Sequence, residues 1–385
     1  MRLKDVCTVF ADGDWIESKD QSEEGIRLVQ TGNIGEGIYL EKESRAKYIS
    51  EDTFKRLKCT EIFAGDILVS RLPEPVGRAC IIPDKTERMI TAVDCTICRP
   101  DSNLISKEYL CYFMRSNTYY TRLLGNVTGT TRKRISRKNL GNVELRVPSK
   151  EEQKSVVERL DCLLKVIESR AKELQLLDDL IKARFVEMFG EPRINPFGFE
   201  KMMLKDTCKV ITGNTPSRAV EDYYGNYVEW IKTDNIVSGI LNPTKASESL
   251  SEKGMRVGRI VDANAILMAC IAGSVTSIGR VCVTNRTVAF NQQINAVVPE
   301  KYNVLFLYTL FQISKDYLVE DINMSLKGIL SKSRLEEKEF IVPPMELQND
   351  FANFVEQVDK SKVVIQKALD ETQLLFDSLM QKYFG

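Results

Sequence analysis

The sequence repeats itself once, and this internal duplication constrains the fold more than any other feature. Short segments of the first half recur in the same order about 200 residues later. They are LKD at 3–5 and 204–206, TGNI and TDNI at 31–34 and 233–236, Gly-Arg-x-Cys at 77–80 and 279–282, V-P-x-x-E-x-Q at 147–153 and 342–348, and Phe-Gly at 189–190 and 384–385. Periods of tens of residues indicate repeat arrays, whereas one period near half the chain indicates a duplicated domain with its connector. We therefore expect two related but non-identical units, which can present two different recognition surfaces.

Composition limits the class of protein. A chain of 385 residues suits two or three domains, each large enough for its own core. Its formal net charge is zero, which argues against a uniformly basic surface but leaves room for a local basic stripe that binds nucleic acid. The first residues lack the apolar segment of a signal peptide, and no stretch reaches the length of a membrane span. We expect a cytoplasmic protein.

The absence of histidine excludes several kinds of chemistry. Ser-His-Asp and Cys-His catalysis cannot occur in this chain, nor can metal sites that depend on imidazole. Cys95 and Cys98 form a lone CxxC with no second pair to complete a zinc site. We interpret these thiols as part of a strand, reduced in the cytoplasm, and expect no metal.

Each half is predicted to be a mixed α/β (α+β) domain followed by one long helix. Short β-rich segments between Pro and Gly turns, and then an apolar helical segment, occur in both halves. In the first half these are strands at 61–70, 79–83 and 89–98 and a helix over 107–122; in the second half they are strands at 264–270, 280–284 and 288–299 and a helix over 304–319. The expected boundaries are 1–148 for the first domain, 149–190 for its helix, 191–200 for a linker, 201–343 for the second domain and 344–385 for its helix.

The two long helices carry a heptad pattern. Ser149 is a candidate N-cap with Glu152 completing a capping box, and Gly190 is a typical helix stop. Lys362 interrupts the pattern in the second helix. Five heptads favour a coiled coil, in which the two helices pair antiparallel, over helices that each pack on their own domain. A 40-residue helix spans roughly 60 Å, so the pair would act as a ruler. The predicted coiled-coil residues are Leu160, Ile167, Leu174, Ile181, Val355, Val358, Ile365, Leu369 and Phe376.

A basic run before the first long helix is the best candidate for DNA contact. Basic residues occur between 122 and 138 without a single acidic one, beside Gly and hydroxyl residues that suit phosphate contacts. Asn and Gln can read adenine through two hydrogen bonds, so polar loop residues are candidate base readers. The predicted DNA-binding set is Arg132, Lys133, Arg134, Arg137, Lys138, Asn33 and Gln30 in the first half, and Lys327, Lys332, Arg334, Asn291, Gln292 and Gln293 in the second.

Motifs for catalysis are missing. The chain has no Asp/Asn/Ser-Pro-Pro-Tyr/Phe motif for amino methyl transfer, no glycine-rich loop for S-adenosylmethionine and no GxxxxGK[ST] phosphate loop. The Glu-x-Lys triplets that could complete a nuclease site lie at or beside predicted helix starts rather than on a strand. We therefore expect no catalytic residues and no cofactor bound to this chain.

These features together resemble the DNA-specificity (S) subunit of type I restriction–modification systems. The resemblance covers nearly the whole chain and rests on the two V-P-x-x-E-x-Q motifs, each followed by a heptad helix, and on the helix ends at Leu180–Gly190 and Leu379–Gly385. It implies a non-catalytic subunit with two target-recognition domains. It also implies partners: double-stranded DNA, methyltransferase (M) subunits, normally two, and a motor/endonuclease (R) subunit. S-adenosylmethionine, ATP and Mg would be used by those partners.

The geometry of such a subunit predicts its mechanism. Two antiparallel helices relate the halves by a pseudo-two-fold axis, and half-sites on one DNA face lie roughly 34–36 Å apart. Each domain would read one half of a bipartite target, which is asymmetric because the domains differ in sequence. Three alternatives stay open: the specificity subunit of a type II enzyme with a bipartite site, a self-contained DNA methyltransferase or nuclease, and a coiled-coil scaffold unrelated to DNA.

Overall fold

The computed structural model describes residues 1–125, 133–274, 277–320, 322 and 328–385, and the chain divides into two compact units. The first unit comprises Met1–Ser169 and Ala368–Gly385, and the second comprises Arg170–Lys367. Each unit therefore combines one α/β domain with a part of both long helices.

Among the described residues of the first unit, the strands form two four-stranded sheets. One sheet is antiparallel, in the order β1-β8-β5-β6. The other has the order β3-β2-β7-β4, in which β2 and β7 run parallel and the outer pairs antiparallel. The strands are β1 (Cys7–Asp12), β2 (Ile26–Val29), β3 (Tyr48–Ile49), β4 (Glu61–Ile62), β5 (Ile67–Ser70), β6 (Ala79–Ile81), β7 (Met89–Thr91) and β8 (Cys95–Pro100).

The second unit has the same topology, as the duplicated sequence predicts. Its antiparallel sheet has the order β10-β18-β14-β16, and its mixed sheet has the order β12-β11-β17-β13 with β11 and β17 parallel. The strands are β10 (Cys208–Thr212), β11 (Tyr224–Ile231), β12 (Ser249–Leu250), β13 (Ile260–Val261), β14 (Ile266–Ala269), β16 (Val281–Val283), β17 (Val288–Phe290) and β18 (Ile294–Pro299); two small sheets pair β15 (Ile271–Ala272) with β19 (Gly328–Ile329) and β9 (Lys201–Met203) with β20 (Glu339–Ile341).

Several predicted elements are shorter than expected. The predicted strand at 61–70 is two strands, β4 and β5, separated by a turn at Gly65, whose φ is +91°. The strand at 89–98 is also two strands, β7 and β8, because the chain turns at Ala92–Asp94 and passes from one sheet to the other. The segment 288–299 is divided in the same way into β17 and β18.

The predicted helix over 107–122 is likewise two helices. It is broken at Ser116, whose side-chain oxygen accepts the N–H of Tyr119 at 3.2 Å and so caps a new helix. In the second unit the break falls at Ser314. The short helices are α1 (Glu51–Leu57), α2 (Lys107–Phe113), α3 (Asn117–Leu124), α4 (Arg137–Gly141), α6 (Glu252–Val257), α7 (Val304–Ile313), α8 (Lys315–Val319) and α9 (Lys332–Glu337), with 3₁₀ turns η1 (Leu3–Val6), η2 (Ser18–Asp20), η3 (Thr31–Asn33), η4 (Glu43–Arg45), η5 (Leu204–Asp206), η6 (Glu221–Tyr223) and η7 (Thr233–Asn235).

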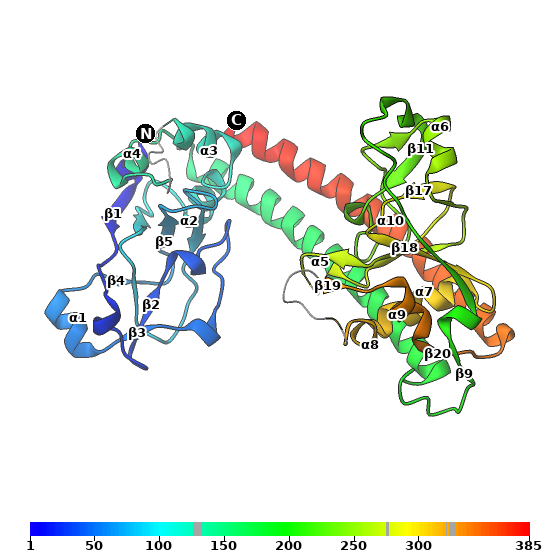
Figure 1. The fold of residues 1–385 in the computed structure, drawn as a ribbon. Helices are drawn as coiled ribbons and strands as arrows, with labels where there is room; N and C mark the ends of the chain where they lie inside the picture. The colour runs from blue at the N-terminus through cyan, green and yellow to red at the C-terminus, as the bar shows by residue number, and fades with distance from the viewer. Residues whose placement is uncertain (126–132, 275–276, 321, 323–327) are drawn as a thin grey trace. The chain divides into compact units, whose positions relative to one another are not determined.

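The two long helices are α5 (Lys150–Phe189) and α10 (Met345–Phe384), each of 40 residues and each drawn as one unbroken helix in Figure 1. In the first unit, Leu160 near the start of α5 shares a core with Phe376 near the end of α10. In the second unit, Phe185 near the end of α5 shares a core with Phe351 near the start of α10. The helices are therefore antiparallel. The residues predicted for the pairing are all buried or half-buried: Leu160, Ile167, Leu174, Ile181, Val355, Val358, Ile365, Leu369 and Phe376.

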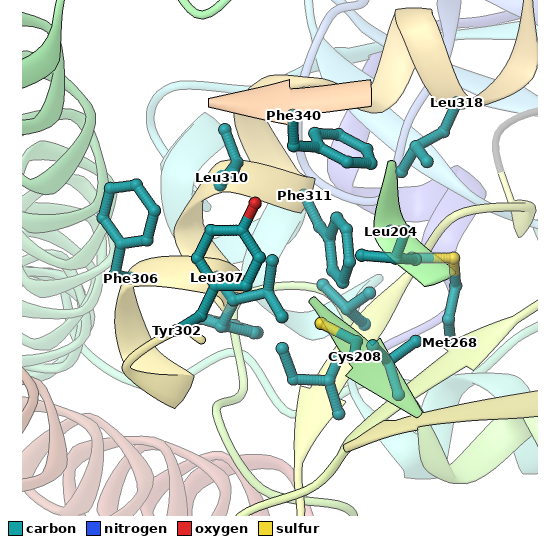
Figure 2. Packing of buried hydrophobic residues seen from close by; sticks show 14 of the residues in the cluster. Leu204, Cys208, Met268, Tyr302, Phe306, Leu307, Leu310, Phe311, Leu318 and Phe340 are labelled. Atoms are coloured by element: carbon teal, nitrogen blue, oxygen red, sulfur yellow. The ribbon is translucent and has the colours of Figure 1, made fainter. Parts of the chain in front are cut away.

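The core of the second unit lies between its antiparallel sheet and α7 (Figure 2). Figure 2 shows side chains of α7, among them Leu307 and Phe311, facing Cys208 of β10 and Met268 of β14. The end of α5 completes this core, since the ring of Phe189 lies 4.8 Å from that of Phe306. In the first unit, Phe384 of α10 occupies the corresponding place, 5.2 Å from the ring of Tyr109. The repeated Phe-Gly motif therefore joins each helix end to the domain of its unit.

The repeated V-P-x-x-E-x-Q motif fixes the start of each long helix. Gln153 is 1% exposed; its amide oxygen accepts the N–H of Ser106, the N-cap of α2, at 2.8 Å, and its NH₂ group donates to Leu104 and Pro148 carbonyls at 2.9 Å. Gln348 is also 1% exposed and accepts the N–H of Asn303, the N-cap of α7, at 2.9 Å. Each buried glutamine thus ties a long helix to the helix that covers the neighbouring sheet.

Within the described residues, no helix combines the length and the apolar character that a bilayer crossing needs.

Candidate nucleic-acid interface

The repeated TGNI and TDNI segments form matching turns. The side-chain oxygen of Asn33 accepts the N–H of Gln30 at 3.0 Å, and its NH₂ group donates to the Leu40 carbonyl at 3.0 Å. Asn235 accepts the N–H of Lys232 at 3.0 Å in the same way. Both asparagines are buried, at 5% and 8% exposed. They hold the η3 and η7 turns, so the recurrence of this motif reflects the scaffold.

The arginine of each Gly-Arg-x-Cys motif donates hydrogen bonds to backbone carbonyls of the same turns. The Arg78 guanidinium donates to the carbonyls of Thr31 at 2.8 Å and Ile34 at 2.7 Å. Arg280 donates to the Thr233 carbonyl at 3.3 Å. The two motifs, far apart in the sequence, are therefore one structural unit in each domain.

Loops at one edge of the sheets come together in the first unit. We call this group the first loop rim: Gly13–Ile16, Gln30, Arg71, Ala92–Asp94 and Lys133–Ile135. Backbone hydrogen bonds join its segments, from Gly13 N–H to Cys95 O at 2.9 Å, Ala92 N–H to Val29 O at 3.0 Å, Arg71 N–H to Asp94 O at 2.9 Å and Ile135 N–H to Arg71 O at 3.2 Å. The described end of the basic run therefore lies beside the β7–β8 turn.

Arg71 is a buried cation within the first loop rim. It is 5% exposed, lies 3.4 Å from an Asp12 carboxylate oxygen and donates to the Val93 carbonyl at 2.5 Å. Burial lowers the pKa of its guanidinium, and the nearby Asp12 charge opposes that shift. Arg134 makes an ion pair with Asp94 at 2.7 Å. These pairs hold the basic segment against the turn.

The second unit carries the matching second loop rim: Gly213–Pro216, Lys232, Cys270, Asn291–Gln293 and Ile329–Leu330. The same backbone hydrogen bonds recur, from Gly213 N–H to Ile294 O at 3.0 Å, Asn291 N–H to Ile231 O at 3.0 Å, Cys270 N–H to Gln293 O at 2.8 Å and Leu330 N–H to Cys270 O at 2.9 Å. Cys270 replaces Arg71, and Gln293 replaces Asp94. The second rim is thus built on the same backbone, with neutral groups in place of Arg71 and Asp94 and a cation, Lys232, in place of Gln30.

Cations and aromatic rings lie beside the second loop rim. The Arg218 guanidinium is 4.4 Å from the centre of the Tyr224 ring and pairs with Glu248 at 2.6 Å. Lys232 also pairs with Glu248 and lies 5.2 Å from the Trp230 ring. Hydrogen bonds from Lys232 and Arg218 lower the pKa of the Glu248 carboxyl, so it stays ionised and shared between two cations.

The comparisons with known proteins agree with this architecture. A family model for the type I restriction modification DNA specificity domain matches residues 1–178 and 196–372. The chain belongs to this type I DNA-specificity family. It is therefore a specificity subunit, a non-catalytic component with two target-recognition domains.

Relatives and solved structures extend the match along the chain. The HindI specificity subunit of Haemophilus influenzae is 22% identical, covering 83% of this chain and 85% of its own length. The MjaIX specificity subunit of Methanocaldococcus jannaschii is 24% identical, covering 74% and 69%. The crystal structure of the type I restriction-modification S subunit from M. genitalium shares the fold, with a TM-score of 0.59 at 14% identity over 100% of this chain and 95% of that one.

The predicted DNA-binding residues of this specificity subunit fall into four groups. Arg132 and Lys327 lie outside the described residues. Lys133, Arg134, Arg137 and Lys138 in the first unit, and Lys332, Arg334 and Gln292 in the second, are exposed, while Gln30 and Gln293 are half-buried. Asn33 and Asn291 are buried, and their polar atoms bond inside the protein. This placement speaks against Asn33 and Asn291 as base readers, and we omit them from the proposed DNA contacts.

Some rim residues were not in the predicted set. Trp15 is 70% exposed in the loop after β1, and Thr215 occupies the matching loop after β10. Lys232 takes the place of Gln30. The sequence marks the two loops only indirectly, because Gly13 recurs as Gly213, a shift of 200 (213 − 13) that lies close to the shifts of the other duplicated segments.

Cys95 and Cys98 lie in the buried strand β8, as the sequence predicts. Burial raises the pKa of Cys95 to about 12, so its thiol is protonated at neutral pH. Such a thiol is a poor nucleophile and a poor metal ligand.

Proposed function

We propose that this specificity subunit recognises an asymmetric, two-part DNA target, with one half-site bound at each loop rim. The observation that carries the proposal is the pair of rims, built on one backbone scaffold but with different side chains. Because recognition depends on side chains at base edges, two such rims would read two different sequences. The basic residues beside each rim, such as Lys133 and Lys332, supply phosphate contacts that position the domain.

We further propose that α5 and α10 set the length of the unread spacer. Each helix contributes residues to both units, and 40 helical residues span roughly 60 Å. That length exceeds one turn of DNA, the distance that separates half-sites on one face.

The helix pair also offers a docking surface for methyltransferase subunits, and we propose two of them. Apolar side chains stand exposed on both helices within the second unit: Leu176 at 56%, Leu180 at 47%, Val363 at 64% and Val364 at 68%. Exposed apolar groups of this kind favour a protein partner. A motor/endonuclease subunit would join for cleavage, and those partner subunits would use S-adenosylmethionine, ATP and Mg. Such an assembly on chromosomal DNA would work in the cytoplasm.

Insertion of one heptad into both helices tests the spacer proposal. We would insert seven residues after Ser169 in α5 and after Lys367 in α10, where the two units divide. Each heptad adds about 10 Å, which corresponds to about three base pairs. Mapping of methylated adenines in a host with the partner subunits should show unchanged half-sites and a longer spacer. A spacer of the original length would contradict the proposal.

A further inference from the structure

The two loop rims allow each position to be compared with its counterpart in the same chain. Gly13 N–H bonds to Cys95 O, and Gly213 N–H bonds to Ile294 O, at 2.9 and 3.0 Å. The residue after each glycine is also anchored alike. Asp14 accepts the N–H of Thr60 at 2.8 Å, and Asn214 accepts that of Arg259 at 2.8 Å. These matched bonds fix the backbone on both sides of the loop.

With the backbone matched, the next side chains can be paired without ambiguity. Trp15 of the first rim corresponds to Thr215 of the second. Val93 in the β7–β8 turn corresponds to Gln292 in the β17–β18 turn, because Asp94 and Gln293 accept equivalent backbone bonds. Side chains that hold the scaffold keep their role in both units, whereas these two pairs change from apolar to polar. A position whose backbone is fixed and whose side chain differs is suited to specificity.

Thr215 and Gln292 contact each other across the second loop rim. The Thr215 hydroxyl donates a hydrogen bond to Oε1 of Gln292, and both side chains are exposed. An amide oxygen has two lone pairs, so Oε1 can accept a second hydrogen bond while the NH₂ group donates. The hydroxyl therefore fixes which end of the amide is the acceptor and restrains its orientation.

We propose that Gln292, oriented by Thr215, reads an adenine in the half-site of the second recognition domain. The amide oxygen of an outward-facing glutamine can accept a hydrogen bond from the N6 amino group of adenine. Its NH₂ group can donate a second one to N7 of the same base in the major groove. Thr215 is a positioning residue in this arrangement. Trp15 and Val93 cannot form the same pair, so the first domain contacts its half-site differently. The inference rests on the proposed function and names residues that make the two half-sites of the DNA target different.

The test uses the specificity subunit assembled with its methyltransferase partner. Binding to duplexes that carry each base pair in turn at every target position gives the discrimination of wild type and variants. Gln292→Leu should lose roughly 5- to 150-fold of discrimination at one A·T pair of the second half-site, the range that one bidentate contact provides. The first half-site should be read as before. Wild-type discrimination at every position would overturn the inference.

Two further variants separate a lost contact from a damaged fold. Gln292→Glu keeps the size but removes the donor, and a carboxylate accepts from cytosine N4, so preference should move from adenine toward cytosine at the same position. Unchanged adenine preference would overturn the proposal. Thr215→Val should reduce discrimination at that position only, and Thr287→Val, at the other end of β17, is the matched control that should not. Equal behaviour of the two threonine variants would remove Thr215 from the mechanism.

The outcomes also distinguish this inference from the proposed function. If the wild-type complex shows no sequence preference, the proposed function fails. If the wild type is specific but Gln292→Leu retains its discrimination, only the reading by Gln292 fails.

Discussion

At the scale of single residues, the side chains of the duplicated motifs stabilise the fold. Gln153 and Gln348 show this most clearly, because each accepts the N–H of the N-cap residue of a neighbouring helix from a buried position. Gln153→Ala leaves that N–H and two carbonyls without a partner, so we expect a loss of about 2–3 kcal/mol in the free energy of unfolding. Gln175→Ala, on the exposed face of α5, should change it by less than about 0.5 kcal/mol. Chemical denaturation measures both, and equal effects would contradict the role of Gln153.

Phosphate contact is a second residue-scale prediction. Arg134 pairs with Asp94, so its replacement would also disturb the turn, whereas Lys133 and Lys138 are exposed and test charge more cleanly. Lys133→Ala with Lys138→Ala should weaken DNA binding for all sequences and reduce the slope of log K against log salt by roughly 2. Binding titrations over a range of salt concentrations measure the slope. The control is Lys154→Ala with Lys165→Ala on α5, and an unchanged slope in the test variant would exclude this segment from the interface.

At the residue scale, the recurrent motifs of the sequence lie in the scaffold, and the DNA-contacting residues stay a prediction. Asn33 and Gln153 both belong to motifs that recur in the second half of the sequence. Their burial shows that both side chains stabilise the fold. Trp15 and Thr215 differ between the repeats, so recurrence marks the neighbouring glycines, Gly13 and Gly213, but not these two residues.

At the scale of elements, α5 and α10 each begin and end one residue inside the ranges expected from the sequence, 149–190 and 344–385. Periodicity over 40 residues leaves little freedom in the boundaries. The short strands were harder to place, because the run 89–98 passes from one sheet into another with Asp94 as its only charged residue. Only the pairing of β7 with β2, and of β8 with β5, reveals the turn between them.

Lys362, which interrupts the heptads, has an element-scale role. Its side chain is 13% exposed; Nζ lies 2.7 Å from Asp178 Oδ1 on α5 and 3.2 Å from the Gly239 carbonyl. The ion pair thus joins both helices and the loop after η7. Lys362→Met leaves Asp178 without its cation and should cost about 1–2 kcal/mol, a value reduced because Asp178 is partly exposed.

A double variant separates the ion pair from packing. Asp178→Leu with Lys362→Met should recover most of the lost stability, since replacing both charges removes the unpaired carboxylate. Thermal unfolding of the single and double variants gives the comparison. Strictly additive losses would show that the two side chains do not stabilise each other.

At the scale of the whole molecule, duplication and divergence together define the protein. Two domains with the same strand order and the same backbone contacts at their rims carry different side chains at those rims. The sequence predicted this organisation because the repeated motifs lie at structural positions of both units. It could not predict which residues come together at each rim, since that depends on contacts between loops distant in the chain.

The central claim is that each loop rim reads its own half-site. The most direct test is a chimera in which residues 201–343 are replaced by residues 1–148, so that both rims are the first loop rim. Methylated adenines should be mapped across the genome of a host that expresses the chimera with its partner subunits. The chimera should methylate an inverted repeat of the first half-site with the original spacer. Methylation of the original asymmetric target by the chimera would contradict the claim.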